Sequence, residues 1–356
     1  MTNQPVSNNS AANQSDLDEN EICLIQSVSE CIIQHADLVN AKACIADVIR
    51  ENEFLSEPRH LLLVGNSGCG KTTLLDIIRS EHPATTDEFQ LGLRANQTIV
   101  TLSLPSTVTS RYMAISILRA LGDTSALNGN CQELTERLIT NIQKCNVKAI
   151  FLDEFQHMLA LGRAGFQNAN QHLLGARNWI KSIINVTDVT FVLMGMPESQ
   201  ALIDSEPQLE RRFPYMVRLN PFDMPSDQET GLAEFADNLL NAVIEETQLF
   251  VSAERFQDNI QEAIRLYTAT QGIPSSIKDF VTKAVLMAYR RKSQTVTMRD
   301  FASAFRILKQ PRLDFAAIQE LRGANRSLID ALAGRSVNPF TIPQSELHAL
   351  ALTMTA

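Results

Sequence analysis

The sequence predicts an α/β fold, in which a doubly wound, parallel five-stranded sheet is followed by a C-terminal all-helical domain. Short, nearly all-apolar runs alternate with helical patterns as far as Pro221, and beyond that residue the strand signals stop. Strands that alternate with helices indicate a parallel sheet. Strands that are apolar throughout are typical of a sheet covered by helices on both faces. The predicted strands are residues 61–64, 98–104, 149–153, 189–194 and 216–219.

Helical patterns precede the first strand, separate the strands, and dominate the sequence after Pro221. In each pattern apolar residues recur at the three- and four-residue intervals that place them on one face of a helix. Two helices are expected before the first strand, within residues 21–54. The others are predicted at 72–79, 110–121, 132–144 and 169–185, then at 227–247, 252–269, 274–291 and 298–308, with one more around 315–321.

These elements divide the chain into four parts. Residues 1–20 are rich in Asn, Ser, Gln and Asp, which bury little surface, so we expect a disordered tail. Residues 21–221 should hold the N-terminal helices and the α/β domain, and residues 222–310 the helical domain. Residues 311–356 should form a C-terminal helix and a tail that we assign to partner binding.

Composition restricts the class of protein. Of the 356 residues, 44% are hydrophobic and 20% are charged, which is ordinary for a globular domain. The net charge of −9 argues against nucleic-acid binding through bulk charge, but it leaves room for a local basic track. The six cysteines form no C-x-x-C pair, so we expect no disulfides, no zinc site and a reducing cytoplasm. No apolar run predicts a membrane span, and no signal peptide is apparent.

A complete G-x-x-x-x-G-K-S/T phosphate-binding loop follows the first strand and opens the next helix. Its glycines let successive backbone N–H groups surround a triphosphate, and the helix N-terminus favours negative charge. Lys71 adds a positive charge for the β- and γ-phosphates, and the Thr72 hydroxyl can ligate Mg²⁺. The sequence therefore predicts binding of ATP with Mg²⁺ by Gly65, Asn66, Ser67, Gly68, Cys69, Gly70, Lys71, Thr72 and Thr73.

An acidic pair ends the third predicted strand, about 80 residues after the phosphate loop. The four apolar residues of this strand would carry Asp153 and Glu154 to the carboxyl edge of the sheet, beside the loop. Asp153 is the expected second ligand to Mg²⁺. Glu154 is the expected catalytic group, because a carboxylate there can orient and polarise a water for attack on the γ-phosphate.

Two arginines lie just before the fifth predicted strand, in Glu210-Arg211-Arg212-Phe213. ATPases of this layout generally place here an arginine that reaches into the neighbouring subunit's site and neutralises charge on the γ-phosphate. We take Arg212 as the first candidate for this catalytic role and Arg211 as the second. The alternative is a solvated pair without a catalytic role.

Together with the phosphate loop, three further motifs resemble the TniB/TnsC family of AAA+ ATPases over about residues 35–305. These motifs are Leu-Asp-Glu-Phe-Gln-His at 152–157, Met-Gly-Met-Pro-Glu at 194–198 and Gln-Leu-Glu-Arg-Arg-Phe at 208–213. The family regulates transposition in Tn7-like elements, including CRISPR-associated ones, and in Tn5053-like elements. The resemblance implies an AAA+ P-loop NTPase with a helical lid that assembles on double-stranded DNA as a homo-oligomeric ring or helical filament. It also implies a link between a TniQ/TnsD-like target-selection protein and a TnsB-like transposase.

The sequence departs from the family pattern at two positions. Met196 replaces the polar residue that senses the γ-phosphate, and a thioether is only a weak hydrogen-bond acceptor. Ser275 and Ser276 stand where many AAA+ proteins place a nucleotide-contacting arginine, and Lys278 is the nearest cation. Both departures suggest slow hydrolysis or a weakly coupled sensor, with ATP binding retained. Hydrolysis is also expected to depend on assembly, because the arginine comes from a neighbouring subunit. Gln156 and His157 belong to the motif at 152–157, and the alternative is that they simply cap a short helix or face solvent.

DNA contacts are expected at two junctions where a loop starts a helix. Helix N-termini can meet phosphate oxygens through backbone N–H groups, and family members resemble this sequence in presenting basic or hydroxyl residues there. The alternative is that these residues are ordinary helix caps. The candidates are Thr109, Ser110, Arg111 and Asn130, and the fallback track is Arg163, Arg177 and Lys181.

Two other functions fit the same nucleotide motifs. One is an AAA+ ATPase of a secretion or other complex that does not bind DNA. Such proteins usually carry a membrane segment or a peptidoglycan-binding domain, and neither is visible in this sequence. The other is an ATPase similar to initiators or helicase loaders, which binds DNA but has different partners.

Overall fold

The computed structural model describes residues 17–83, 85–89, 92–96, 98–159, 167–308, 338–344 and 347. Within these, only the backbone is described at 85–89, 92–96, 159 and 167–173. The chain forms two compact units, each of which is described by itself. The α/β unit comprises Gln34–Asp223 and Gly272–Ser276, and the helical unit comprises the remaining described residues. Most of the tail expected over residues 1–20 and the helix expected near 315–321 lie outside the described residues.

The α/β unit is built on a parallel sheet with the strand order β4-β5-β6-β1-β7, which confirms the predicted fold class. In the register of the sheet Leu62 pairs with Leu193 on one side and with Met216 on the other. Because the strands are parallel, the loops that follow β1, β5 and β6 meet at one edge of the sheet. The strands are β1 (Leu61–Gly65), β4 (Ile99–Ser103), β5 (Ala149–Asp153), β6 (Thr190–Gly195) and β7 (Tyr215–Leu219).

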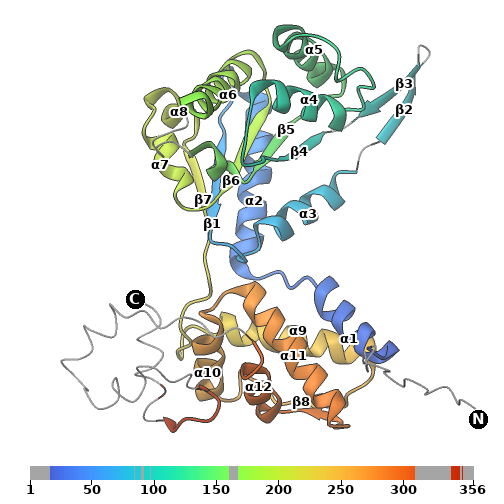
Figure 1. The fold of residues 1–356 in the computed structure, drawn as a ribbon, viewed down its shortest axis with the longest axis vertical. Helices are drawn as coiled ribbons and strands as arrows, with labels where there is room; N and C mark the ends of the chain where they lie inside the picture. The colour runs from blue at the N-terminus through green and yellow to red at the C-terminus, as the bar shows by residue number, and fades with distance from the viewer. Residues whose placement is uncertain are drawn as a thin grey trace, which may run out of the picture. The chain divides into compact units, whose positions relative to one another are not determined.

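Helices cover both faces of this sheet (Figure 1). Alternate residues of a strand point to opposite faces, so Leu61 and Leu63 pack against α2 and α3, while Leu62 and Val64 pack with α4, α5 and α6. This double burial explains why the strands read as unbroken apolar runs. The helices are α2 (Ala36–Glu51), α3 (Lys71–Glu81), α4 (Ser110–Ala120), α5 (Cys131–Lys144), α6 (Gln167–Val186), α7 (Ser199–Asp204) and α8 (Pro207–Arg212).

A two-stranded antiparallel hairpin lies between α3 and β4 and was not predicted. It consists of β2 (Thr85–Phe89) and β3 (Gly92–Asn96), in which Thr85 pairs with Asn96. Two short 3₁₀ helices complete the unit, η1 (Asn52–Phe54) after α2 and η2 (Phe155–Leu159) directly after β5.

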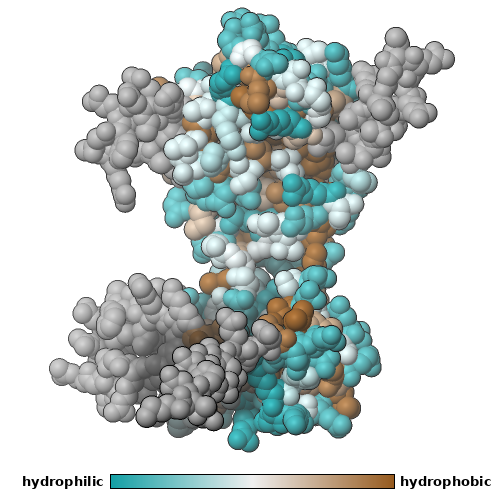
Figure 2. Space-filling model, turned by 45° about the vertical axis from the view of Figure 1, so that its right-hand side comes forward, coloured by the Kyte–Doolittle hydropathy of each residue, from teal (hydrophilic) through white to brown (hydrophobic). Residues whose placement is uncertain are grey.

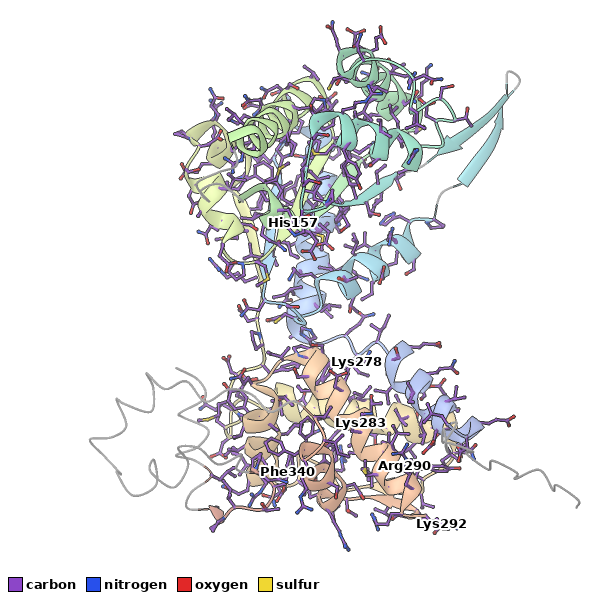
Figure 3. The ribbon with its side chains drawn as sticks, viewed as in Figure 1. His157, Lys278, Lys283, Arg290, Lys292 and Phe340 are labelled. Carbon is purple, nitrogen blue, oxygen red and sulfur yellow. The ribbon has the colours of Figure 1, made fainter. Side chains whose placement is uncertain are left out.

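The helical unit contains five helices and a two-residue parallel strand pair among its described residues. Its interior includes an edge-to-face contact of Phe256 with Phe301, whose ring centroids lie 5.0 Å apart. Phe340 stacks on Phe280 and on Phe301, and Figure 3 shows it within this unit, so the described part of the expected C-terminal tail belongs to the helical core. The elements are α1 (Glu19–Glu30), α9 (Gly231–Thr247), α10 (Ile260–Thr270), α11 (Pro274–Arg290, of which the part from Ile277 onward belongs to this unit), α12 (Met298–Phe305), β8 (Ser252–Ala253) and β9 (Thr295–Val296).

The first helix, α1, groups with the helical unit. From the sequence, the N-terminal helices from residue 21 onward were instead expected to share one domain with the α/β sheet. Glu21 forms an ion pair with Arg290 at 2.6 Å, and Ser27 donates its hydroxyl to Glu246 at 2.7 Å. Leu24 and Val28 are fully buried on the same side of the helix. The helix therefore packs on α9 and α11 despite the long sequence separation.

Hydrophobic residues form small, separate patches among hydrophilic ones on the face shown in Figure 2. The most exposed large hydrophobic side chain among the described residues is Phe54, at 84%. A helix that is both long enough and apolar enough to cross a bilayer is not found in the described part of the chain.

Candidate nucleotide site

The phosphate loop folds into a tight turn between buried β1 and the start of α3. Gly68 and Gly70 have φ angles of +83° and +95°, a backbone region that side chains with a Cβ rarely adopt. Gly65 has no room for a side chain, since a Cβ there would lie 2.6 Å from the carbonyl oxygen of Leu219. These three positions explain why the loop needs glycine.

Lys71 is the first residue of α3, and its ammonium group lies over the loop. Its Nζ donates to the carbonyl oxygens of Gly65 at 2.5 Å and Asn66 at 3.1 Å. A cation held at the start of a helix, beside a turn of left-handed glycines, can bind phosphate oxygens. Thr72 is exposed and Thr73 half-buried in the first turn of α3, while Cys69 is buried and packs in the core below.

The acidic pair lies where β5 ends at the same edge of the sheet. Asp153 is the last strand residue and is 8% exposed, and its Oδ1 accepts the N–H of Glu154 at 2.8 Å. Burial raises the pKa of the Asp153 carboxyl, and the charge of Lys71 acts in the opposite direction. Glu154 has a φ of +60°, which turns the chain sharply out of the strand.

The residues at hand fit a magnesium ion that is shared with a nucleotide. Mg²⁺ is usually bound by one or two protein oxygens together with phosphate and water. The Asp153 carboxylate and the Thr72 hydroxyl are oxygen donors of this kind, and Lys71 is close enough to Asp153 to influence its titration. Among the described residues no group of three His, Cys, Asp or Glu side chains forms a separate metal cage.

Gln156 makes two hydrogen bonds that the sequence did not suggest. Its amide nitrogen donates to the carboxylate of Glu154, and its amide oxygen accepts the backbone N–H of Met196 at 3.1 Å. These contacts do not fit the alternative of a mere helix cap or a solvent-facing side chain. Its side chain instead joins the turn after β5 to the turn after β6.

His157 fixes the other side of the same turn. Its Nδ1 lies 2.7 Å from the carbonyl oxygen of Leu104, so Nδ1 carries the proton and donates. The backbone N–H of Leu104 in turn donates to the carbonyl oxygen of Asp153 at 3.0 Å. His157, labelled in Figure 3, thus ties η2 to the end of β4 and does not simply face solvent.

The segment Gly272–Ser276 contacts the phosphate loop within the α/β unit. Ser275 donates its backbone N–H to the carbonyl oxygen of Gly68 at 3.1 Å. Lys278 belongs to the helical unit, where its Nζ donates to the carbonyl oxygens of Ser29 at 3.1 Å and Cys31 at 2.7 Å. Burial lowers the pKa of Lys278. Figure 3 shows Lys278 near the start of α11, with Lys283, Arg290 and Lys292 following along the chain.

The two candidate arginines both pair with one carboxylate. Glu57 binds Arg212 at 2.9 Å and Arg211 at 3.2 Å. Arg212 also donates to the amide oxygen of Asn185 at 3.2 Å and is 20% exposed, whereas Arg211 is 78% exposed. They line a cavity of about 400 Å³ together with Glu57, Lys181, Ile184, Asn185, Pro207, Gln208 and Leu209.

The two junctions proposed for DNA contact are both capped helix starts. The Thr109 hydroxyl accepts the N–H of Tyr112 at 3.1 Å, and Asn130 accepts the N–H of Glu133 at 3.0 Å. The Glu133 carboxylate returns the bond by accepting the N–H of Asn130 at 2.9 Å. The side chains of Thr109 and Asn130 therefore act as helix caps, the alternative considered above.

The same two junctions lie side by side in the structure. Arg111 donates to the carbonyl oxygen of Leu127 at 3.1 Å and to that of Gly129. The Cys131 thiol donates to the Ser110 hydroxyl at 3.4 Å. Sequence positions that were considered separately thus form one surface, with Arg111 exposed between them.

The fallback track is less suited to DNA. Arg177 is 9% exposed and donates to the carbonyl oxygen of Met158, and burial lowers its pKa. Lys181 forms an ion pair with Glu206. Arg163 lies outside the described residues.

The sheet order, the phosphate loop on β1 and the acidic pair on β5 define an ATPase of the AAA+ P-loop class. A comparison with protein families matches residues 29–223 to the family described as bacterial TniB protein. The chain belongs to this TniB family, which confirms the resemblance drawn from its motifs. A comparison with curated proteins found no match.

Solved structures with similar folds include ORC and Cdc6 proteins. The ORC2 protein of Aeropyrum pernix, in ADPNP–ADP complexes, is 14% identical with a TM-score of 0.53, over 92% of this chain and 84% of that one. The ORC1 protein of the same organism, in complex with DNA, is 17% identical with a TM-score of 0.50, over 94% and 87%. Cdc6p from Pyrobaculum aerophilum is 14% identical with a TM-score of 0.51, over 92% and 82%. At these identities the likeness establishes a shared fold.

Proposed function

We propose that the protein is an ATP-dependent, DNA-binding regulator of transposition. It oligomerises on double-stranded target DNA and links a TniQ/TnsD-like target-selection protein to a TnsB-like transposase. The match of residues 29–223 to the TniB family carries this proposal, because that match covers the phosphate loop, the acidic pair and the arginines together. The DNA complex of the similarly folded ORC1 protein from Aeropyrum pernix agrees with a DNA-associated role.

The residues of the candidate site have distinct roles in this proposal. Lys71 and the backbone N–H groups of the loop bind the phosphates of ATP, which needs the ammonium group to leave the loop carbonyls that it contacts here. Thr72 and Asp153 hold Mg²⁺, which when bound neutralises charge on the phosphate oxygens. Glu154 orients the attacking water.

Completion of the site requires a second subunit. Arg212, or Arg211, reaches the γ-phosphate bound by a neighbouring protomer and stabilises charge there. Glu57 holds both arginines in the isolated chain, so their release accompanies assembly. We further propose that residues 311–356 serve partner binding, although Phe340 within them already packs in the helical unit.

The first test separates nucleotide binding from hydrolysis. Lys71→Ala should abolish ATP binding, because the ammonium group contacts phosphate in the ground state. Glu154→Gln should keep ATP binding but stall turnover, because the carboxylate acts on the attacking water. Nucleotide titration and phosphate release measure the two effects. Normal turnover by Glu154→Gln would remove Glu154 from its proposed role.

The second test addresses DNA and the partners. Glu154→Gln with ATP should sediment with duplexes of unrelated sequence, and Lys71→Ala should not, because assembly on DNA needs bound nucleotide. Pull-down of a TnsB-like transposase and a TniQ/TnsD-like target-selection protein should succeed only with the assembled form. An ATPase of a DNA-free complex would show neither behaviour, and a helicase loader would sediment with DNA but recruit other partners.

A further inference from the structure

Gln156 lies between the candidate catalytic carboxylate and the turn that follows β6. Its amide nitrogen donates to Glu154, and its amide oxygen accepts the N–H of Met196 at 3.1 Å. Only one orientation of the amide satisfies both partners, because a carboxylate can only accept and an N–H can only donate. A carboxamide is therefore the group that the position requires.

The backbone around Gln156 is shaped to admit this amide. Gly195 precedes Met196, and a Cβ added there would lie 2.9 Å from Oε1 of Gln156 and 2.4 Å from the hydroxyl of Ser199. Glu154 has a φ of +60°, so its carboxylate comes off a sharp turn that it adopts only at a cost. The hydrogen bond from the Gln156 amide then holds the Glu154 side chain in one position.

The side chain at 196 cannot replace this contact. A methionine thioether is a weak acceptor and donates no hydrogen bond, so the backbone N–H is the one hydrogen-bond donor that Met196 has at this turn. Through that N–H, a displacement of the turn after β6 moves the Gln156 amide, and the amide moves the Glu154 carboxylate.

We propose that Gln156 is a positioning residue for ATP hydrolysis, which aligns Glu154 with the attacking water and couples it to the turn Gly195–Met196. The inference rests on the proposed catalytic role of Glu154. In this arrangement Gln156 connects Glu154 to the turn after β6 through the backbone N–H of Met196. A polar side chain at position 196 would otherwise make that connection. Gln156 touches neither ATP nor water in this role.

The test compares Gln156→Ala with the control Gln143→Ala, an exposed glutamine of α5. Loss of a hydrogen bond to a charged group corresponds to a fall of about ten- to a hundredfold in kcat. We expect this fall for Gln156→Ala, with KM for ATP and the affinity for a non-hydrolysable ATP analogue changed by less than about twofold. Gln143→Ala should match the wild type.

Gln156→Glu is the isosteric variant, and it should lose more activity than Gln156→Ala because it sets a second carboxylate against Glu154. Gly195→Ala should lower kcat like Gln156→Ala, since its Cβ displaces the amide oxygen. The combination of Gly195→Ala with Gln156→Ala should be little worse than either change alone, because both break the same link.

A double-mutant cycle with Glu154→Gln identifies the route of the effect. Single-turnover assays with radiolabelled ATP measure the slow residual hydrolysis rate of Glu154→Gln. Adding Gln156→Ala to that variant should not lower this rate further, because the proposed effect of Gln156 acts through Glu154. The inference would be overturned if the double variant lost activity by the product of the two single losses, or if kcat were unchanged in Gln156→Ala. Normal turnover by Glu154→Gln alone would instead overturn the catalytic assignment on which it rests, so the two failures are distinguishable.

Discussion

Ser275 donates its backbone N–H to the carbonyl oxygen of Gly68 at 3.1 Å, so the phosphate loop is held from outside as well as from its own strand and helix. The contact is close enough that a Cβ on Gly68 would lie 2.1 Å from the Ser275 hydroxyl and 3.0 Å from the Ile273 side chain. Gly68 is thus constrained twice, by its positive φ and by its neighbours.

Gly68→Ala should destabilise the α/β unit more than Gly122→Ala does. Both glycines have a positive φ, at +83° and +79°, but nothing lies within 4 Å of a Cβ on Gly122. Gly122→Ala therefore measures the backbone cost alone, roughly 1–2 kcal/mol. Gly68→Ala adds the crowding at Ser275, roughly a further 1–3 kcal/mol. Denaturant unfolding followed by the fluorescence of Trp179 measures both, and equal losses would contradict the contact.

An arginine that acts between subunits can be detected by mixing two inactive variants. Lys71→Ala lacks phosphate binding and Arg212→Ala lacks the arginine, so mixed assemblies regain sites with both groups. We expect Arg212→Ala to lower kcat on the order of 10³-fold, and the mixture to recover part of the wild-type rate. Wild-type activity should also rise with protein concentration.

The same mixture with Arg211→Ala in place of Arg212→Ala decides between the two arginines. The Arg211 side chain is 78% exposed and that of Arg212 is 20% exposed. Only the variant that lacks the acting arginine should be inactive alone and regain activity when it is mixed with Lys71→Ala. If neither mixture recovers activity while all variants still assemble on DNA, the arginines do not act in trans.

His60 should make the α/β unit less stable in mild acid. Its ring is fully buried, and Nδ1 accepts the N–H of Phe191 at 3.2 Å. Burial and the nearby Arg212 lower its pKa to about 3. Below pH 6.5 the His60 ring binds a proton in the unfolded chain, whereas in the folded chain it stays neutral down to about pH 3. The free energy of unfolding therefore falls through this window, by up to about 1.4 kcal/mol per pH unit from this group.

Carboxylates contribute to acid unfolding as well, so the measurement is a difference between variants. Urea unfolding followed at Trp179 between pH 7 and pH 5 should show a shallower pH dependence for His60→Gln than for the wild type. His82 is exposed, and His82→Gln should leave the dependence unchanged. Parallel curves for all three proteins would show that His60 titrates normally.

The central strands and the phosphate loop were predictable because their signals are local. Each strand is a short apolar run, and the loop pattern is contiguous from Gly65 to Thr72. The order β4-β5-β6-β1-β7 arises from packing between distant segments, and no local pattern encodes it. The hairpin β2–β3 was missed because Thr85–Phe89 and Gly92–Asn96 are rich in charged and polar residues without a sustained alternation.

The unpredicted parts of the site depend on contacts that are remote in sequence. Gln156 meets Met196 across 40 residues, and its bond to Glu154 depends on a positive φ at a non-glycine residue, which no propensity anticipates. The pairing of Arg211 and Arg212 with Glu57 spans more than 150 residues. Likewise, α1 joins the helical unit through Arg290, whose partner Glu21 lies 269 residues away.

Arg111 provides the sharpest test of DNA binding, because it is exposed between two helix starts. Contacts to phosphates carry no base information, so Arg111→Ala should weaken binding equally for unrelated duplexes. Loss of one phosphate contact should also make the plot of log affinity against log salt shallower by about 0.9. Arg119→Ala, at the other end of α4, is the control and should bind normally. Filter binding with ATP across a salt series measures both. Because Arg111 already donates to Leu127 and Gly129, an unchanged affinity and slope would mean that it only fixes this loop, and that DNA binds elsewhere.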